Sequence, residues 1–255
     1  MIKKLIVILA LGLSVAFPQN NDDDDYEPVY RAPAFDAQFG GGGGYYGGVF
    51  FTDLSKINST FAGFGTPDLT SGFYSSGGGG FVYIGAIKNL RVGGLGMSAR
   101  TSSRGSSNGF DKEISYSNSF GGVTVEYSFP FIRDWALSIG GIIGIGGQTI
   151  EVSRHFGAMD WDKDVAALHD DVGGAFLSYS RKYSNTYMTL APTLNADFLL
   201  HPFISFRVGV GYAFNMFGDT WKADNNVTLN NFPARDINGN TFFLQFGVLA
   251  GLFFY

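Results

Sequence analysis

Residues 204–216 alternate strictly between apolar and small or polar side chains, and this period of two constrains the fold most. The apolar positions are Ile204, Phe206, Val208, Val210, Tyr212, Phe214 and Met216. The positions between them are Ser205, Arg207, Gly209, Gly211, Ala213 and Asn215. Because successive side chains of a β-strand point to opposite faces, the pattern predicts a strand with one wholly apolar face.

Similar alternation recurs along the chain and predicts an all-β protein. The expected strands lie in residues 34–49, 81–87, 92–97, 114–131, 135–148, 187–200, 204–216 and 241–255. Short turns join three pairs, and polar segments at about 52–77, 102–112, 153–185 and 217–240 join the others. We therefore predict an eight-stranded antiparallel up-and-down transmembrane β-barrel. A hairpin within residues 175–183 would give ten strands, and this alternative stays open.

The faces opposite the apolar stripes are unlike the exterior of a soluble protein. They consist mostly of Gly, Ala, Ser, Thr and Asn, and only 15% of the chain is charged, against about 25% in typical soluble domains. Strands cross a bilayer only as a closed barrel, and small residues fill the narrow interior of an eight-stranded one. We therefore expect the apolar stripes to face lipid.

The N-terminal region is predicted to consist of a secretory signal followed by a leader segment. Residues 1–16 have a short basic start, an apolar core and a small-residue end, which predicts a cleaved secretory signal peptide. Residues 17–33 carry five acidic residues and one basic residue and are predicted to be a flexible periplasmic leader, so the barrel occupies residues 34–255. Because the chain has no basic stripe, we expect no nucleic-acid partner. The absence of cysteine excludes disulfides and thiolate metal sites.

Short turns at one end and long loops at the other are typical of outer-membrane barrels. In this architecture the chain resembles the small outer-membrane β-barrel family typified by the OmpA transmembrane domain and OmpX. The resemblance implies an outer-membrane location with extracellular loops and a periplasmic N-terminus. It also implies contact with outer-membrane lipid and lipopolysaccharide, and a monomer without cofactors.

The C-terminus fits the same resemblance. Members of the family commonly end in an aromatic residue that the barrel-assembly machinery reads, and Phe253, Phe254 and Tyr255 resemble that signal. The usual signal sets the last residue on the lipid face. In residues 246–254 the even-numbered positions form the cleaner apolar set, so the sequence leaves the register of the last strand open.

Several charged residues fall on the predicted inward face near the short-turn end. They are Asp36, Arg91, Glu126, Asp197 and Arg207. Because an unmatched buried charge costs several kcal/mol, we predict a salt-bridge network that plugs the barrel. The alternative is a selectivity constriction within a conducting pore.

The third long segment holds candidates for metal binding and catalysis. Asp160, Asp162, Asp164 and Asp171 echo the spacing of a calcium loop, but Val165 stands where the sharp turn requires glycine. A solvated loop is the alternative. His155 and His169 lie near serines, yet no spacing fixes a nucleophile, a base and an orienting group together.

The sequence thus predicts a noncatalytic barrel with a plugged lumen and a structural or surface-interaction role, such as adhesion or lipopolysaccharide contact. Aromatic residues in the polar segments are candidate contacts: Phe61, Phe64, Phe73, Tyr74, Trp161 and Trp221. One alternative is a transporter of small solutes or apolar molecules. A second is a lipid-modifying outer-membrane enzyme.

Overall fold

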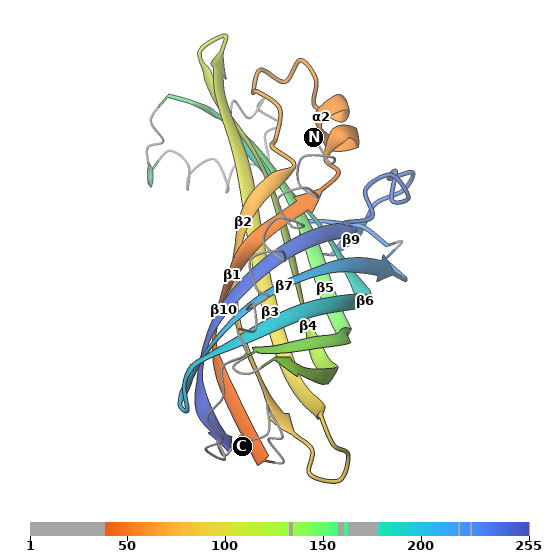
Figure 1. The fold of residues 1–255 in the computed structure, drawn as a ribbon. Helices are drawn as coiled ribbons and strands as arrows, with labels where there is room; N and C mark the ends of the chain where they lie inside the picture. The colour runs from red at the N-terminus through yellow and green to blue at the C-terminus, as the bar shows by residue number, and fades with distance from the viewer. Residues whose placement is uncertain are drawn as a thin grey trace, which may run out of the picture. The chain divides into compact units, whose positions relative to one another are not determined.

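The computed structural model describes residues 39–132, 135–157, 161–162, 178–218, 220–224 and 226–254. Its elements are β1 (Phe39–Thr52), α2 (Ser55–Thr60), β2 (Gly72–Tyr83), β3 (Leu90–Ser107), β4 (Phe110–Ile132), β5 (Trp135–Phe156), β6 (Tyr179–His201), β7 (Ile204–Met216), β8 (Lys222–Ala223), β9 (Val227–Thr228) and β10 (Thr241–Phe254) (Figure 1). None of the described helices is long and apolar enough to cross a membrane.

The long strands close into an antiparallel barrel of eight. Their order is β5-β4-β3-β2-β1-β10-β7-β6, and pairing of β5 with β6 completes the ring. The predicted eight-stranded barrel is confirmed, and the ten-stranded alternative is wrong. The two additional strands, β8 and β9, form a short hairpin beside β6 and outside the ring, while residues 179–183 continue β6.

The strands are strongly tilted around the barrel. A row of directly paired residues starts at Trp135 and passes through Phe198, Phe206, Val248, Tyr45, Gly78, Gly96 and Gly121 before it returns to β5 at Ile145. From position 135 to position 145 on β5 the row has climbed ten residues. This stagger closes the sheet and gives the strand tilt that a barrel requires.

The apolar stripes face outward, as the alternation predicts. Large exposed apolar side chains form a band that we call the apolar belt: Val123, Val125 and Tyr127 on β4, Trp135, Leu137, Ile139, Ile143 and Ile145 on β5, Met188, Leu190 and Leu194 on β6, Ile204, Val208, Tyr212, Phe214 and Met216 on β7, and Phe242, Phe246, Val248 and Leu252 on β10. The alternate positions, such as Ser205, Arg207 and Ala213 on β7, are buried inside the barrel. The even-numbered face of the last strand is therefore the outward one.

The interior is filled by side chains. The rings of Phe50, Phe120 and Phe243 contact one another in the middle of the barrel, with centroids 5.4–6.1 Å apart. A Cβ atom at Gly211 would lie 2.3 Å from the Phe243 ring, so glycine is needed there. Small residues opposite large rings therefore allow the core to close at native packing density.

The second connection differs from the long loop expected at residues 102–112. β3 runs to Ser107 and β4 begins at Phe110, with only Asn108 and Gly109 between them. Both residues have positive φ, 54° and 78°, which is the geometry of a two-residue hairpin turn that Asn-Gly favours. Polar side chains here mark strands that extend beyond the apolar belt, not an irregular loop.

The tight turn requires a positive φ at Gly109, and a substitution there tests this requirement. A Gly109→Val substitution places a β-branched residue at φ 78° and is expected to cost about 1–2 kcal/mol locally. Hydrogen exchange of the amides in residues 103–114 should accelerate roughly ten-fold or more. Asn108→Gly is the control and should leave the exchange unchanged, because glycine accepts positive φ. Equal protection in both variants would contradict the turn.

Candidate functional site

Four charged side chains meet inside the barrel near its short-turn end. Arg91 on β3 is paired directly with Glu126 on β4, and Asp197 on β6 with Arg207 on β7. Each points inward because it lies on the face opposite the apolar stripe of its strand. All four side chains are at most 5% exposed. We call this group the charged quartet.

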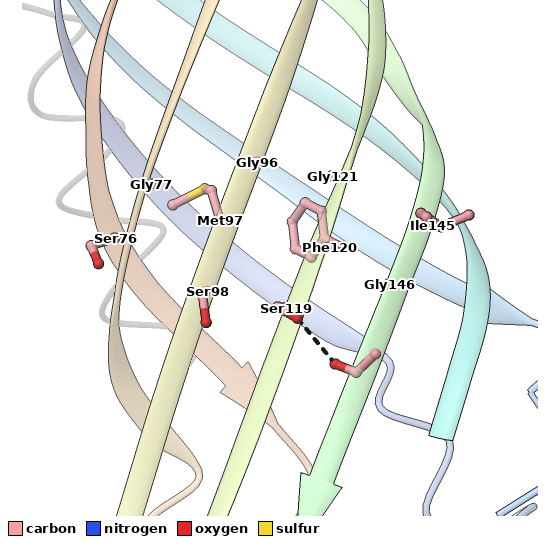
Figure 2. A pocket seen from close by; sticks show the side chains of 11 residues that line it. Ser76, Gly77, Gly96, Met97, Ser98, Ser119, Phe120, Gly121, Ile145 and Gly146 are labelled. Atoms are coloured by element: carbon pink, nitrogen blue, oxygen red, sulfur yellow. Dashed lines mark hydrogen bonds between the residues drawn. The ribbon is translucent and has the colours of Figure 1, made fainter. Parts of the chain in front are cut away.

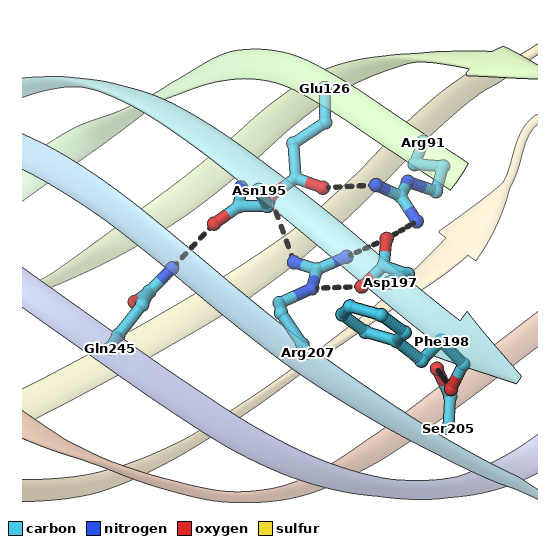
Figure 3. Close-up of polar contacts among 8 residues, drawn as sticks. All are labelled: Arg91, Glu126, Asn195, Asp197, Phe198, Ser205, Arg207 and Gln245. Carbon is cyan, nitrogen blue, oxygen red and sulfur yellow. Dashed lines mark hydrogen bonds and ion pairs between the residues drawn. The ribbon is translucent and has the colours of Figure 1, made fainter. Parts of the chain in front are cut away.

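Ion pairs link the quartet both along the wall and across the lumen (Figure 3). Along the wall, Arg91 Nη2 lies 2.9 Å from Glu126 Oε2, and Arg207 Nε lies 2.6 Å from Asp197 Oδ1. Across the lumen, Arg91 Nη1 lies 2.6 Å from Asp197 Oδ2, and Arg207 Nη1 lies 3.0 Å from Glu126 Oε1. Two positive and two negative charges therefore balance within one closed network.

Neighbouring groups complete the network. Asn195 Nδ2 donates to Glu126 Oε1 over 3.2 Å, and Gln245 Nε2 donates to Asn195 Oδ1 over 2.7 Å. The guanidinium carbons of Arg91 and Arg207 lie 4.4 and 4.8 Å from the centre of the Phe81 ring. Charges taken out of water are tolerable only when geometry and further hydrogen bonds compensate for lost hydration, and these contacts supply both.

The structure thus brings together four of the five residues chosen from inward parity and charge. The fifth, Asp36, lies outside the described residues. Sequence reasoning misses Asn195 and Gln245. Their inward parity on β6 and β10 is readable, but their role as a polar extension of the quartet depends on how the strands are staggered.

At the end of the lumen away from the quartet, described residues of the last connection, 217–240, contact inward side chains of the barrel. Asn118 Nδ2 donates to the carbonyl of Gly239 over 3.0 Å, and Gln148 Nε2 donates to the carbonyl of Ile237 over 3.0 Å. Trp221 and Ile237 are buried in the apolar core together with Leu54, Ile57 and Leu69 of the first connection. These connections therefore fold into a cap over the barrel mouth.

Four of the six aromatic residues expected as candidate contacts lie in the core or pack against it. Phe73 and Trp221 are buried, and Phe61 and Phe64 pack against the core. Tyr74 lies on the outward face of β2, and only Trp161 among the six is a freely exposed loop aromatic, at 79%. Aromatic residues in polar segments here cover the apolar lumen, which the composition of the loops does not reveal.

One small cavity lies beside the quartet, on the side of the aromatic core. An enclosed cavity of about 10 Å³ is bordered by Tyr46, Thr124, Glu126, Thr193, Arg207 and Gln245, among others. A space of this size is on the scale of one water molecule. The lumen is therefore occupied by side chains at the quartet, at the aromatic core and at the cap.

Beyond the apolar belt, charges on the extended strands are paired at the surface. Arg100 Nη2 lies 2.9 Å from Glu151 Oε2, and Arg181 Nη1 lies 2.5 Å from Asp224 Oδ2. The backbone N–H of Lys182 and then the Arg181 guanidinium hold the pKa of Asp224 below its usual value. Such exposed pairs contribute little to stability. The Arg181–Asp224 pair lies where β8 is paired with β6.

The candidate metal-binding and catalytic residues do not form an assembled site within the described residues. Asp162 is exposed, while Asp160, Asp164 and Asp171 lie outside these residues. No group of three or more His, Cys, Asp or Glu in the described chain is arranged to hold a metal. His155 Nδ1 has no hydrogen-bond partner within that part of the chain, and His169 lies outside it.

The C-terminal aromatics end the last strand. Phe253 and Phe254 pair through their backbone with Gly40 and Phe39, which joins the two ends of the barrel sheet. Tyr255 lies outside the described residues. Their reading as an assembly signal stays a prediction.

Comparisons with known proteins give similarities of fold at low sequence identity. The chain matches no protein-family model and no curated protein sequence. It is similar to the attachment invasion locus protein Ail of Yersinia pestis, solved with the heparin analogue sucrose octasulfate, with 14% identity over 83% of this chain and 98% of that one and a TM-score of 0.38.

Two further solved structures are similar at the same level. Neisserial surface protein A has 10% identity over 86% of this chain and 98% of its own, with a TM-score of 0.38. OprG of Pseudomonas aeruginosa has 13% identity over 85% and 95%, also with a TM-score of 0.38. Likenesses at such identities and TM-scores are too weak to assign a function, and the fold rests on the strand pairing.

The quartet predicts a large loss of stability when one charge is removed. Arg207→Met leaves Asp197 and Glu126 short of a buried partner and should cost about 3–5 kcal/mol, measured by urea unfolding in detergent micelles. Arg207→Met combined with Asp197→Leu restores neutrality and should recover part of the loss. Arg100→Met, on the exposed surface, should cost less than about 1 kcal/mol. Equal stability of the two single variants would contradict the network.

Proposed function

We propose that the protein is a noncatalytic, non-conducting β-barrel of a bacterial outer membrane with a structural or surface-contact role. The observation that carries this proposal is the combination of an outward apolar belt with described side chains that occupy the lumen at the quartet, at the aromatic core and at the cap. A barrel with this exterior is matched to lipid. A barrel with this interior offers no aqueous path.

The height of the apolar belt supports a membrane span. On β5 the belt extends from Trp135 to Ile145. Ten steps of about 3.3 Å, on a strand tilted by about 40°, cover roughly 25 Å along the barrel axis. This equals the apolar band of about 25 Å that outer-membrane barrels present to lipid. Backbone groups at this depth are paired within the closed sheet.

The strands that continue past the belt support the surface-contact role. β3, β4, β5 and β6 extend beyond it with polar and charged outward residues such as Arg100, Arg104, Glu113, Glu151 and Lys182. In the outer membrane the end with long connections faces outside. These residues then stand at and above the headgroups of the outer leaflet, where lipopolysaccharide and external surfaces are the partners in reach.

The two alternatives have less support. A channel for small solutes needs a continuous path, whereas the cavity between quartet and cap measures about 10 Å³. An enzyme needs a nucleophile joined to a base, and no hydrogen bond in the described chain joins His155 or His201 to a serine hydroxyl. The channel alternative predicts a flux of small solutes through the barrel, and the enzyme alternative predicts turnover of a substrate.

Conductance tests the proposal directly. The purified chain, inserted into planar lipid bilayers, should give no steady current steps, and liposomes containing it should not swell in small sugars. A general porin inserted in the same way is the positive control. Stable, reproducible conductance from the folded barrel would contradict a closed lumen and favour the channel alternative.

A further inference from the structure

Two hollows of the described barrel differ in kind. The larger, of about 470 Å³, lies on the outer faces of β2, β3, β4 and β5 and is lined by glycines and short side chains such as Ser98 and Ser119 (Figure 2). Ser119 Oγ already donates to the carbonyl of Gly147 over 3.4 Å. No side chain that lines this hollow has a buried polar atom without a partner in the described chain. Nothing in its lining therefore calls for a ligand.

The small cavity beside the charged quartet is of the opposite kind, and we call it the quartet cavity. It is enclosed and measures about 10 Å³. Thr193 on β6 and Gln245 on β10 both border it, and they are 5% and 2% exposed. Neither Thr193 Oγ1 nor Gln245 Oε1 has a hydrogen-bond partner within the described part of the chain. Two buried polar groups without partners thus border one small space.

The quartet sets the orientation of the Gln245 amide. The ionised carboxylate of Glu126 only accepts hydrogen bonds, so Asn195 turns its Nδ2 toward it, at 3.2 Å. Asn195 Oδ1 then faces the other way and accepts from Gln245 Nε2 over 2.7 Å (Figure 3). Gln245 is therefore left with its acceptor, Oε1, and the group that satisfies it in the quartet cavity has to be a donor.

The carboxylate of Glu126 also borders the cavity and has capacity for one more donor. An ionised carboxylate offers about four lone-pair sites. Three are used by Arg91 Nη2, Arg207 Nη1 and Asn195 Nδ2. The Thr193 hydroxyl can either donate or accept. A ligand that donates twice and accepts once would therefore satisfy all three groups that face the cavity.

Charge and size restrict the ligand further. The cavity is bordered by the guanidinium of Arg207 and by the carboxylate of Glu126, so a cation would meet the first and an anion the second. The two positive and two negative charges of the quartet already balance, and an added ion would be a buried charge without compensation. A volume of about 10 Å³ is near the lower limit for one water molecule. The fitting ligand is therefore neutral and as small as water.

We propose that the quartet cavity binds a single, long-lived water molecule, which donates to Gln245 Oε1 and to the Glu126 carboxylate and accepts from the Thr193 hydroxyl. Buried waters typically make about three such bonds to groups that otherwise lack partners. Leu95 and Ile142 border the same cavity and offer no polar partner, so the water is held in place and does not belong to a continuous file. It links β4, β6 and β10 through the interior, and the inference does not depend on what the apolar belt contacts.

Water-oxygen magnetic relaxation dispersion of the full chain, folded in detergent micelles, tests the site. The method counts water molecules that stay bound for longer than the particle takes to tumble, and exchanging hydroxyl protons do not contribute to the oxygen signal. Thr193→Ile keeps the β-branch, removes the hydroxyl and sends a further methyl group into the cavity. This variant should hold one long-lived water fewer than the wild-type chain. Equal counts in the two chains would overturn the proposal.

Thr189→Ile is the matched control, because it makes the same change on the same strand. Thr189 is buried, does not border the cavity, and donates directly to Asn215 Oδ1 over 3.0 Å. This variant should keep the wild-type number of long-lived waters. A loss as large as that in Thr193→Ile would contradict a water specific to the quartet cavity. Different gel mobility before and after boiling checks that each variant is folded.

Thr193→Val provides a second test that does not depend on filling the cavity. Valine has nearly the shape of threonine, so the water keeps Gln245 and Glu126 and loses only the hydroxyl. Its residence time, measured from the temperature dependence of the dispersion, should shorten roughly five-fold, as expected for one lost hydrogen bond. An unchanged residence time would contradict the assignment of Thr193 as a partner, even where Thr193→Ile fails to fold.

Exchange of salts separates water from a bound cation. The count for the wild-type chain and its difference from Thr193→Ile should be the same in sodium chloride and in choline chloride. A difference that appears only when sodium is removed would place a sodium ion in the cavity and overturn the proposal. Steady conductance in bilayers together with the expected water count would contradict the proposed function alone.

Discussion

Pairing of every backbone N–H and C=O inside a closed sheet is the constraint on which the rest of this structure depends. A bilayer offers no water to satisfy these groups, so only a ring of strands without free edges can cross it. The ring closes here because β5 pairs with β6 and β1 with β10 along their shared lengths. The stagger of ten residues around the ring then fixes which side chains share a level, both inside and outside.

Closure also dictates what the interior can contain. Eight strands leave a narrow lumen, so charged side chains there cannot keep their hydration and must neutralise one another. The quartet of Arg91, Glu126, Asp197 and Arg207 does this with pairs along the wall and across it. The outer face follows the opposite rule, because large apolar side chains cover most of it at the depth of the apolar belt.

Much of this organisation can be predicted from the sequence because the period of two is local information. Alternation identifies the strands, the outward faces and four inward charges. The Asn108–Gly109 turn is also local, yet the polar residues around it favour a loop. The cap and the alignment of residues between strands are not predictable in this way. Burial of Trp221 depends on how a connection folds over the lumen, and alignment of Gly78, Gly96 and Gly121 depends on register between strands.

The central claim is that the apolar belt contacts lipid, and solubility with and without an amphiphile tests it most directly. Purified chain folded in detergent or lipid should migrate differently on gels before and after boiling, and should lose its fold and aggregate when the amphiphile is removed. A chain that remains dissolved and cooperatively folded in plain buffer, with the same β-structure, would contradict the account.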